Sequence, residues 1–216
     1  MLNVRFVGPA LLAGTLASLI CYVAVTVAVR IDTRLLEGAR RAVERHGWEG
    51  ATLQRLADEA GVSRMTLHRR GVSREVLLAA LAERLEFEYR EALWPALTAP
   101  GSALERLKLA LASLCDVVDA NLELLEALGH AERDVVFHEQ RRPALTKTVF
   151  TEPVRRLLAD GVADGSLSVA DPEETATVLF NLVGHTYRHL RAGHGWSPKR
   201  TRRAVLELAL HGVVAR

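Results

Sequence analysis

The chain has 216 residues, enough for one or two domains that bury a sizeable apolar core. Its 28 basic and 26 acidic residues leave a net charge of only +2, which excludes a strongly basic protein, so any nucleic-acid surface must be a local patch. The two cysteines, Cys21 and Cys115, lie far apart in apolar contexts, which argues against a disulfide framework or a cysteine metal site and for a reducing, cytoplasmic compartment.

Residues 1–30 form an apolar N-terminal extension. Residues 10–29 are twenty uncharged, mostly apolar residues, the length that crosses a bilayer. Two interpretations remain open: a start site assigned too far upstream, with translation beginning near residues 23–29, or a genuine membrane anchor. The first is favoured, because only Arg30 and Ile31 separate this segment from the next helix, and an anchor would press the following domain against the lipid headgroups.

Helical periodicity begins at Asp32, and no alternating strand pattern of useful length follows. Capping residues and glycines predict helices over residues 32–46, 53–60 and 64–70 and from residue 73 onward, with Pro95, Pro100 and Gly101 marking a boundary. The first helix should bury Leu35, Leu36, Ala39, Ala42, Val43 and His46. Further helices are expected over about residues 102–120, 122–129, 132 onward, 153–164, 172–192 and 198 to the C-terminus. The predicted fold class is all-α.

Residues 53–72 meet the steric requirements of a helix-turn-helix, in which two short helices cross with little space between them. Ala57 provides a small side chain where the helices meet, Gly61 permits a positive φ at the turn, and Ser63 can cap the second helix. An ordinary helical hairpin would not need these three features at mutually consistent spacing. The sequence therefore predicts a helix-turn-helix domain at residues 31–78.

The charge around the second of these helices points to DNA. Residues 61–74 contain four arginines, one histidine and no acid. The start of this helix should enter the major groove, so we expect base contacts from Arg64, Met65 and His68. Contacts to the phosphate backbone are expected from Thr52, Ser63, Thr66, Arg69, Arg70 and Arg74.

The run Gly47-Trp48-Glu49-Gly50-Ala51-Thr52, followed by Leu56-Ala57-Asp58-Glu59-Ala60-Gly61-Val62-Ser63-Arg64 and Thr66-Leu67, resembles the tetracycline-repressor (TetR) family. The resemblance covers about residues 32–85 and implies a homodimer of Ω-shaped helical protomers that repress transcription until a small molecule binds the C-terminal domain. Two departures stand out: His68 and Arg69 replace aromatic residues, and Gly71 replaces a phenylalanine that plugs the space between two helices. The missing plug is expected to loosen the helix at residues 64–70.

Residues 79–216 are predicted to form a helical domain for ligand binding and dimerisation. The resemblance places the dimer interface on the last two helices, whose apolar face would be Val178, Leu179, Leu182, Val183, Leu206, Leu208 and Leu210. The alternative, that these residues line only the core of one protomer, stays open. A ligand pocket is expected near Phe87, Trp94, Cys115, Phe137, His138, Phe150 and Phe180.

Metal and enzyme signatures are weak or missing. His185 and His189 share a helix face, and His130, Asp134 and His138 repeat at helical spacing, but no third ligand at a fixed spacing accompanies either set, so no metal site or cofactor is predicted. No Gly-rich phosphate loop or nucleophile elbow is present, so no enzymatic activity is expected. The sequence predicts a DNA-binding repressor acting as a homodimer on a near-palindromic double-stranded operator and responding to a small-molecule ligand; the alternative is a membrane-anchored sensor.

Overall fold

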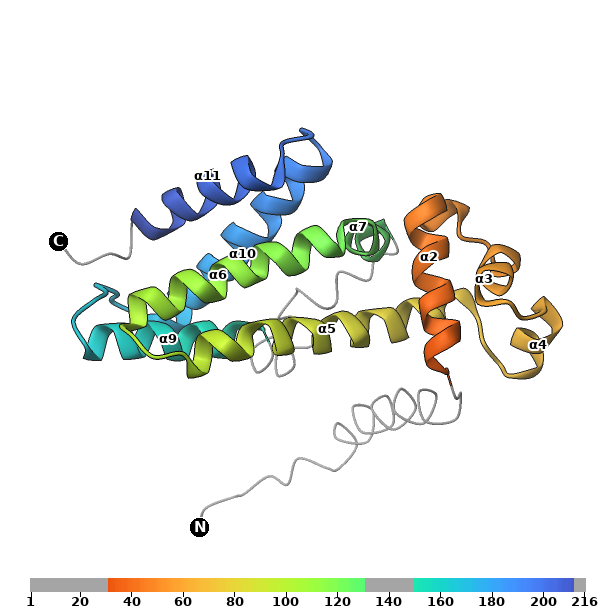
Figure 1. Ribbon diagram of the computed structural model, residues 1–216, viewed down its shortest axis with the longest axis horizontal. Helices are drawn as coiled ribbons and strands as arrows, with labels where there is room; N and C mark the ends of the chain where they lie inside the picture. Colours follow the sequence, from red (N-terminus) through yellow and green to blue (C-terminus); the bar gives the residue numbers. More distant parts are fainter. Residues whose placement is uncertain (1–30, 131–149, 212–216) are drawn as a thin grey trace, which may run out of the picture. The chain divides into compact units, whose positions relative to one another are not determined.

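The computed structural model describes residues 31–130 and 150–211. These residues form helices and no strand, which confirms the predicted fold class (Figure 1). In this part of the chain, no helix combines the length and the apolar character needed to cross a bilayer. The apolar residues 10–29 lie outside the described residues, as do the predicted ligand residues Phe137 and His138.

The described residues divide into two compact units. The first contains residues 31–42 and 51–80, and the second contains residues 43–50, 81–130 and 150–211.

The first unit is built from α2 (Thr33–Gly50), α3 (Leu53–Ala60), α4 (Arg64–Arg69) and the start of α5 (Arg74–Thr98) (Figure 1). Gly47 interrupts α2 with φ 62° and ψ 174°, so the helix breaks where the sequence predicts its end. The core of the unit consists of small and aliphatic side chains: Leu35, Ala39, Ala42, Leu56, Ala57, Ala60, Leu67, Val72, Leu77 and Leu78. The expectation that α2 buries His46 is wrong, because His46 is exposed in the turn next to the Gly47 break.

Helices α2 and α3 approach each other at backbone distance. A Cβ atom added at Gly38 of α2 would lie 2.5 Å from the Cα and 2.6 Å from the backbone nitrogen of Ala60 in α3. Polar contacts tie the same two helices: Arg41 donates from Nη2 to the carbonyl of Glu59 at 2.6 Å, and its Nε lies 3.4 Å from the Glu59 carboxylate. The role of Gly38 was not apparent from the sequence, because it depends on where the two helices cross.

The second unit contains the rest of α5 together with α6 (Ala103–Ala120), α7 (Leu122–His130), α9 (Glu152–Ala163), α10 (Pro172–Ala192) and α11 (Pro198–His211). Helix α10 packs against α6, α9 and α11, and α6 also contacts α7, α9 and α11 (Figure 1). The core of this unit is therefore centred on α6 and α10.

Helix α5 runs through Pro95, which the sequence analysis took as part of a helix boundary. Proline lacks an N–H and costs the helix one backbone hydrogen bond. The last turn is retained because the Thr98 hydroxyl donates to the Trp94 carbonyl at 3.0 Å and the Ala99 N–H donates to the Pro95 carbonyl at 2.8 Å. The helix ends at Thr98, before Pro100 and Gly101.

The N-terminus of α6 is held by two carboxylates. Ser102 and Glu105 form a capping box, in which the Ser102 N–H donates to Glu105 at 2.9 Å and the Glu105 N–H donates to the Ser102 hydroxyl at 3.3 Å. Asp164, just after α9, accepts from the Ala103 N–H at 2.8 Å and from the Ser166 N–H at 2.9 Å. Hydrogen bonds from Ser166 and Ala103 lower the pKa of Asp164 below its ordinary 3.8.

Asp164→Asn is expected to lower the thermal midpoint at pH 7, because the charged carboxylate that joins α6 to the end of α9 is lost. A lowered folded-state pKa means that this stabilisation is complete above the ordinary pKa of 3.8 and is lost as the pH falls below it. Thermal unfolding of both proteins at pH 7 and pH 3 should therefore show a difference that shrinks at the lower pH. An equal difference at both pH values would contradict an ionic origin.

Candidate nucleic-acid interface and ligand cavity

The turn between α3 and α4 has the geometry that the helix-turn-helix motif requires. Thr52 caps α3 by accepting from the Arg55 N–H at 3.3 Å. Gly61 closes the helix in the left-handed conformation (φ 64°, ψ 38°), and the Val62 N–H donates back to the Ala57 carbonyl at 3.0 Å. A β-carbon is disfavoured at this φ, so the turn depends on glycine at position 61.

Helix α4 is short but closed at both ends. The Ser63 hydroxyl accepts from the Thr66 N–H at 3.0 Å and also hydrogen-bonds the Thr66 hydroxyl at 2.9 Å. At the other end Gly71 has φ 68°, and the Val72 N–H donates to the Leu67 carbonyl at 3.0 Å. Leu67 and Val72 are both buried, so aliphatic side chains and a glycine turn hold the helix where the family resemblance leads one to expect a phenylalanine.

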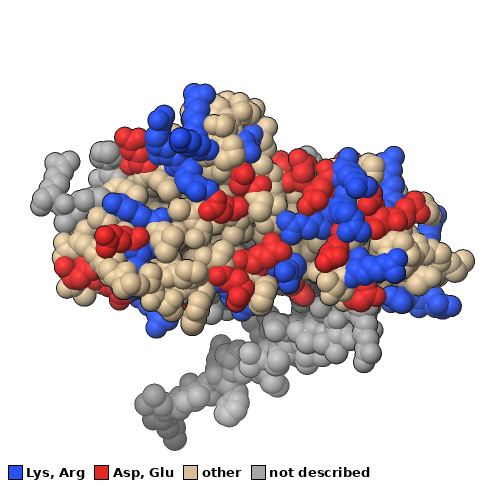
Figure 2. Space-filling model, viewed as in Figure 1, with Lys and Arg blue, Asp and Glu red and all other residues tan. Residues whose placement is uncertain are grey.

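Both turns of α4 present side chains to solvent. Arg64, His68 and Arg69 are exposed, and 73% of the Met65 surface is accessible. Within residues 31–130 and 150–211, no acidic side chain pairs with Arg64 or Arg69. Figure 2 shows Lys and Arg side chains gathered over the first unit, with Asp and Glu among them. Arg64 and Arg69, at the two ends of α4, are therefore available to an external anion.

The other predicted contact residues differ in their surroundings. Thr52 and Ser63 are exposed, whereas Thr66 and Arg74 are half-buried. Arg70 forms an ion pair with Asp32 at 3.3 Å, with side chains that are 44% and 57% exposed. An ion pair this exposed contributes about 1 kcal/mol or less, so a phosphate can compete with Asp32 for Arg70.

In the second unit, an aromatic cluster joins three of its helical segments. The ring centroids of Tyr89, Phe150 and Phe180 lie 5.2 to 5.8 Å apart, and the Tyr89 hydroxyl donates to the Phe150 carbonyl at 2.9 Å. Burial raises the pKa of Tyr89 above its ordinary value, so this hydroxyl stays a neutral donor. The cluster brings two of the predicted ligand residues, Phe150 and Phe180, into direct contact.

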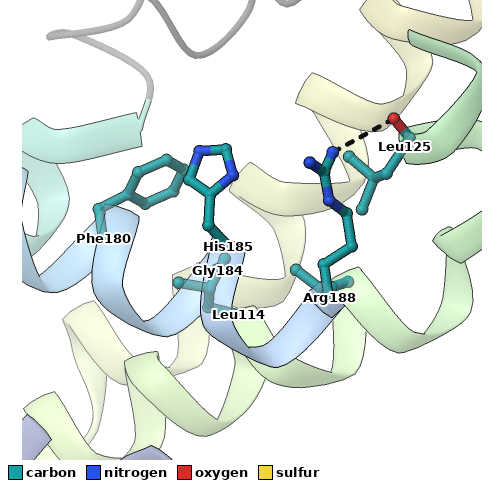
Figure 3. Close-up of a pocket in the computed structure, with 7 residues that line it drawn as sticks. Leu114, Leu125, Phe180, Gly184, His185 and Arg188 are labelled. Carbon is teal, nitrogen blue, oxygen red and sulfur yellow. Dashed lines mark hydrogen bonds between the residues drawn. The ribbon is translucent and has the colours of Figure 1, made fainter. Parts of the chain in front are cut away.

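A cavity lies beside this cluster, between α6, α7 and α10 (Figure 3). It has a volume of about 30 Å³, room for about two water molecules. Arg188 extends along one wall and donates to the Leu125 carbonyl at 3.3 Å, while the His185 ring lies next to Phe180. Its lining residues are Leu114, Val118, Leu125, Phe180, Gly184, His185 and Arg188.

Of the ligand residues predicted from the sequence and described here, Phe180 lines this cavity. Cys115 is buried outside its lining, and burial raises the pKa of its thiol to about 12. Phe87 and Trp94 lie on the exposed side of α5, where 63% of the Trp94 surface is accessible. Arg188 was not predicted as a cavity residue, because the sequence does not distinguish it from the other charged residues expected on the helix surface.

The residues of the predicted dimer face on α10 and α11 fall into three groups by their exposure to solvent. Leu179 and Val183 are buried in the core of the protomer, whereas Val178 is 57% and Leu208 is 70% exposed. Leu182, Leu206 and Leu210 are half-buried. Among the described residues, no group of three or more His, Cys, Asp or Glu side chains is arranged to hold a metal ion.

Comparison with protein families matches both units of the chain. Residues 35–81 match the model of bacterial regulatory proteins of the tetR family, and residues 100–213 match the tetracyclin repressor-like C-terminal domain. No curated protein sequence gives a significant match. The membrane-anchored alternative finds no support in these matches.

Solved structures of similar fold include three regulators from other bacteria. A transcriptional regulator of the TetR/AcrR family from Thermobifida fusca is 24% identical, with a TM-score of 0.65 over 83% of this chain and 96% of that one. The TetR family regulator PfmR from Thermus thermophilus is 20% identical, with a TM-score of 0.64 over 83% and 98%. A TetR family member from Streptomyces coelicolor is 22% identical, with a TM-score of 0.58 over 85% and 92%.

These structures share the fold of the chain, and the two family matches together span both of its units. The chain belongs to the tetR family of bacterial regulatory proteins, and it is a DNA-binding transcriptional regulator with a ligand-binding C-terminal domain.

Proposed function

We propose that this regulator is a homodimeric repressor that places two copies of α4 in successive major grooves of a near-palindromic operator and leaves the DNA when a small molecule binds its second unit. The observation that carries the proposal is the exposure of Arg64 and Met65 in the first turn of α4 and of Arg69 in its last turn, on a helix capped at both ends. Because α4 is capped and its buried side packs into the core, it can hold its arginines in position without an acidic partner inside the protein.

Base and phosphate contacts divide along α4. Arg64 and Met65 begin the helix, from which an arginine can bind the O6 and N7 atoms of guanine and an apolar side chain can contact a thymine methyl group. His68 lies one turn further on the exposed side. Phosphate contacts are assigned to Thr52, Ser63, Thr66, Arg69, Arg70 and Arg74.

The exposed apolar side chains of Val178 and Leu208 support dimerisation through α10 and α11. Apolar side chains this exposed are stabilised when a second copy covers them, and a two-fold interface brings the same helices of both protomers together. Two half-sites related by this symmetry would match the proposed near-palindromic operator.

The cavity beside Phe180 is the proposed entrance of the ligand site, because apolar walls meet two polar side chains, His185 and Arg188. Its small volume in this state means that a larger ligand must displace neighbouring side chains. The predicted residues Phe87, Trp94, Cys115, Phe137, His138 and Phe150 remain candidates for the surroundings of such a ligand. No enzymatic step is proposed for this site.

The proposed function is tested by capturing fragments of the host genome with the full-length protein and sequencing them. Enrichment of fragments that share an inverted repeat, with half-sites about one or two helical turns apart, is expected. Recovery of fragments without a shared sequence would overturn sequence-specific repression.

Arg64→Ala is expected to relax the base preference at one position in each half-site, with a loss of about tenfold in discrimination there. Arg69→Ala should instead weaken binding to all sequences alike. The slope of log affinity against log salt concentration should become shallower by about the amount that one phosphate contact contributes. Gel-shift titrations on operator and random DNA measure both effects, with Arg84→Ala on α5 as a control for the loss of an exposed arginine elsewhere. Identical losses of specificity in both α4 variants would contradict this division.

A further inference from the structure

Two histidines face each other where α10 turns toward α11. His189 lies in the last turn of α10, and His194 lies in the connection after it. Their Nε2 atoms are 3.2 Å apart, the ring centroids are 5.0 Å apart, and both side chains are exposed. The two rings therefore bring the same ring nitrogen, Nε2, to within hydrogen-bond distance of each other.

We propose that His189 and His194 chelate a divalent transition-metal ion of the kind that imidazole prefers, Cu²⁺, Ni²⁺ or Zn²⁺. Metal–imidazole bonds of about 2.05 Å to both Nε2 atoms would span the observed 3.2 Å with an N–metal–N angle of about 103°. This angle lies between the octahedral and tetrahedral values, so the observed separation of the two Nε2 atoms suits a shared ion. A single hydrogen bond between the rings holds the pair together when no metal is bound.

The connection that carries His194 is folded onto the end of α10. The Gly193 N–H donates to the His189 carbonyl at 2.8 Å, and the Trp196 N–H donates to the Leu190 carbonyl at 3.1 Å. Gly195 has φ 63°, a conformation that favours glycine. A Cβ atom at Gly193 would lie 2.9 Å from the His189 carbonyl oxygen, so the backbone passes close to this histidine.

Side chains from three elements secure the same connection. Arg191 donates to the Trp196 carbonyl and to the carboxylate of Asp119 on α6. The guanidinium of Arg200, on α11, lies 3.7 Å from the centre of the Trp196 ring. The backbone that carries His194 is therefore held in place before a metal arrives, which lowers the entropic cost of binding.

The proposed site, His189 with His194, differs from the pair that helical spacing suggested, His185 with His189. His185, one turn before His189, lies beside Phe180 at the cavity (Figure 3). Within the described part of the chain, no third His, Cys, Asp or Glu completes a cluster, so water would occupy the remaining coordination positions. Two neutral imidazoles suit Cu²⁺, Ni²⁺ and Zn²⁺ and discriminate against the oxygen-preferring Mg²⁺.

Calorimetric titration of the untagged full-length chain tests the proposal. Cu²⁺ should bind most tightly, Ni²⁺ and Zn²⁺ more weakly, and Mg²⁺ should give no heat of binding. His189→Asn and His194→Asn should each weaken Ni²⁺ binding at least tenfold, whereas His46→Asn, which removes an exposed histidine from α2, should leave it unchanged. Wild-type affinity for Ni²⁺ in both His189→Asn and His194→Asn would overturn the proposal.

A further variant, Gly195→Ala, tests whether the turn must hold His194 in its observed position. Gly195→Ala keeps both imidazoles but strains the backbone at φ 63°, and it is expected to weaken Ni²⁺ binding about tenfold with the helical content unchanged by circular dichroism. Unchanged affinity in Gly195→Ala would contradict a site held in place by this turn.

Discussion

Gly38→Ala is expected to destabilise the first unit by about 3 kcal/mol and to abolish operator binding. The new methyl group would lie 2.5 Å from the Cα atom of Ala60, and the obstacle is a helix backbone that cannot rotate away as a side chain can. Helices α2 and α3 must then separate, which breaks the support of the turn at Gly61. Chemical denaturation followed by circular dichroism measures the loss, and anisotropy of labelled operator DNA measures binding.

Gly184→Ala provides the matched control, since this glycine also lies inside a helix, but no atom beyond the adjacent backbone of its own helix lies within 4 Å of the position of an added Cβ. Alanine there should stabilise α10 by about 0.5 to 1 kcal/mol, because glycine loses more backbone entropy on folding. Opposite signs of the two changes are therefore expected. Destabilisation of similar size in both variants would show that the close approach at Gly38 is not the cause.

Leu208→Glu is expected to convert the proposed dimer to a monomer and to weaken operator binding at least 100-fold. The side chain is 70% exposed, so the substitution leaves the protomer core intact but places a carboxylate in the interface of the proposed dimer. Two linked DNA-binding units gain about 10² to 10⁴ in affinity over one, and this gain is lost when the protomers separate.

Sedimentation equilibrium reports the mass and gel shift reports the affinity of this variant. Val162→Glu on α9 is the control, because it places the same charge on another exposed apolar residue and should remain a dimer that binds DNA. A Leu208→Glu protein that sediments as the wild type does would rule out this face as the interface.

The local signals in the sequence predicted the first unit well. Thr52, Gly61 and Ser63 act within four residues of their own positions, so capping and turn preferences were sufficient to place α3 and α4. The break of α2 at Gly47 and the all-helical fold followed from the same kind of signal.

Features that depend on how the folded chain is arranged in space could not be predicted. The role of Gly38 depends on the crossing of α2 and α3, and the contact of His194 with His189 depends on the path of a turn. Pro95 was misleading because neighbouring hydrogen bonds maintain the last turn of α5 around it. The apolar stripe of α10 combined core residues with exposed ones, since periodicity alone does not reveal which side a neighbouring helix covers.

The most direct test of DNA recognition by α4 is the affinity of the Arg64→Ala/Arg69→Ala double variant for an operator selected by the wild-type protein. Fluorescence anisotropy at several salt concentrations should show at least a 100-fold loss of affinity and a shallower salt dependence, while Arg84→Ala binds as the wild type does. The double variant should keep the wild-type thermal midpoint, because Arg64 and Arg69 are exposed and pair with no acid among the described residues. Operator binding by the double variant with wild-type affinity and salt dependence would contradict the assignment of α4 as the DNA-reading helix.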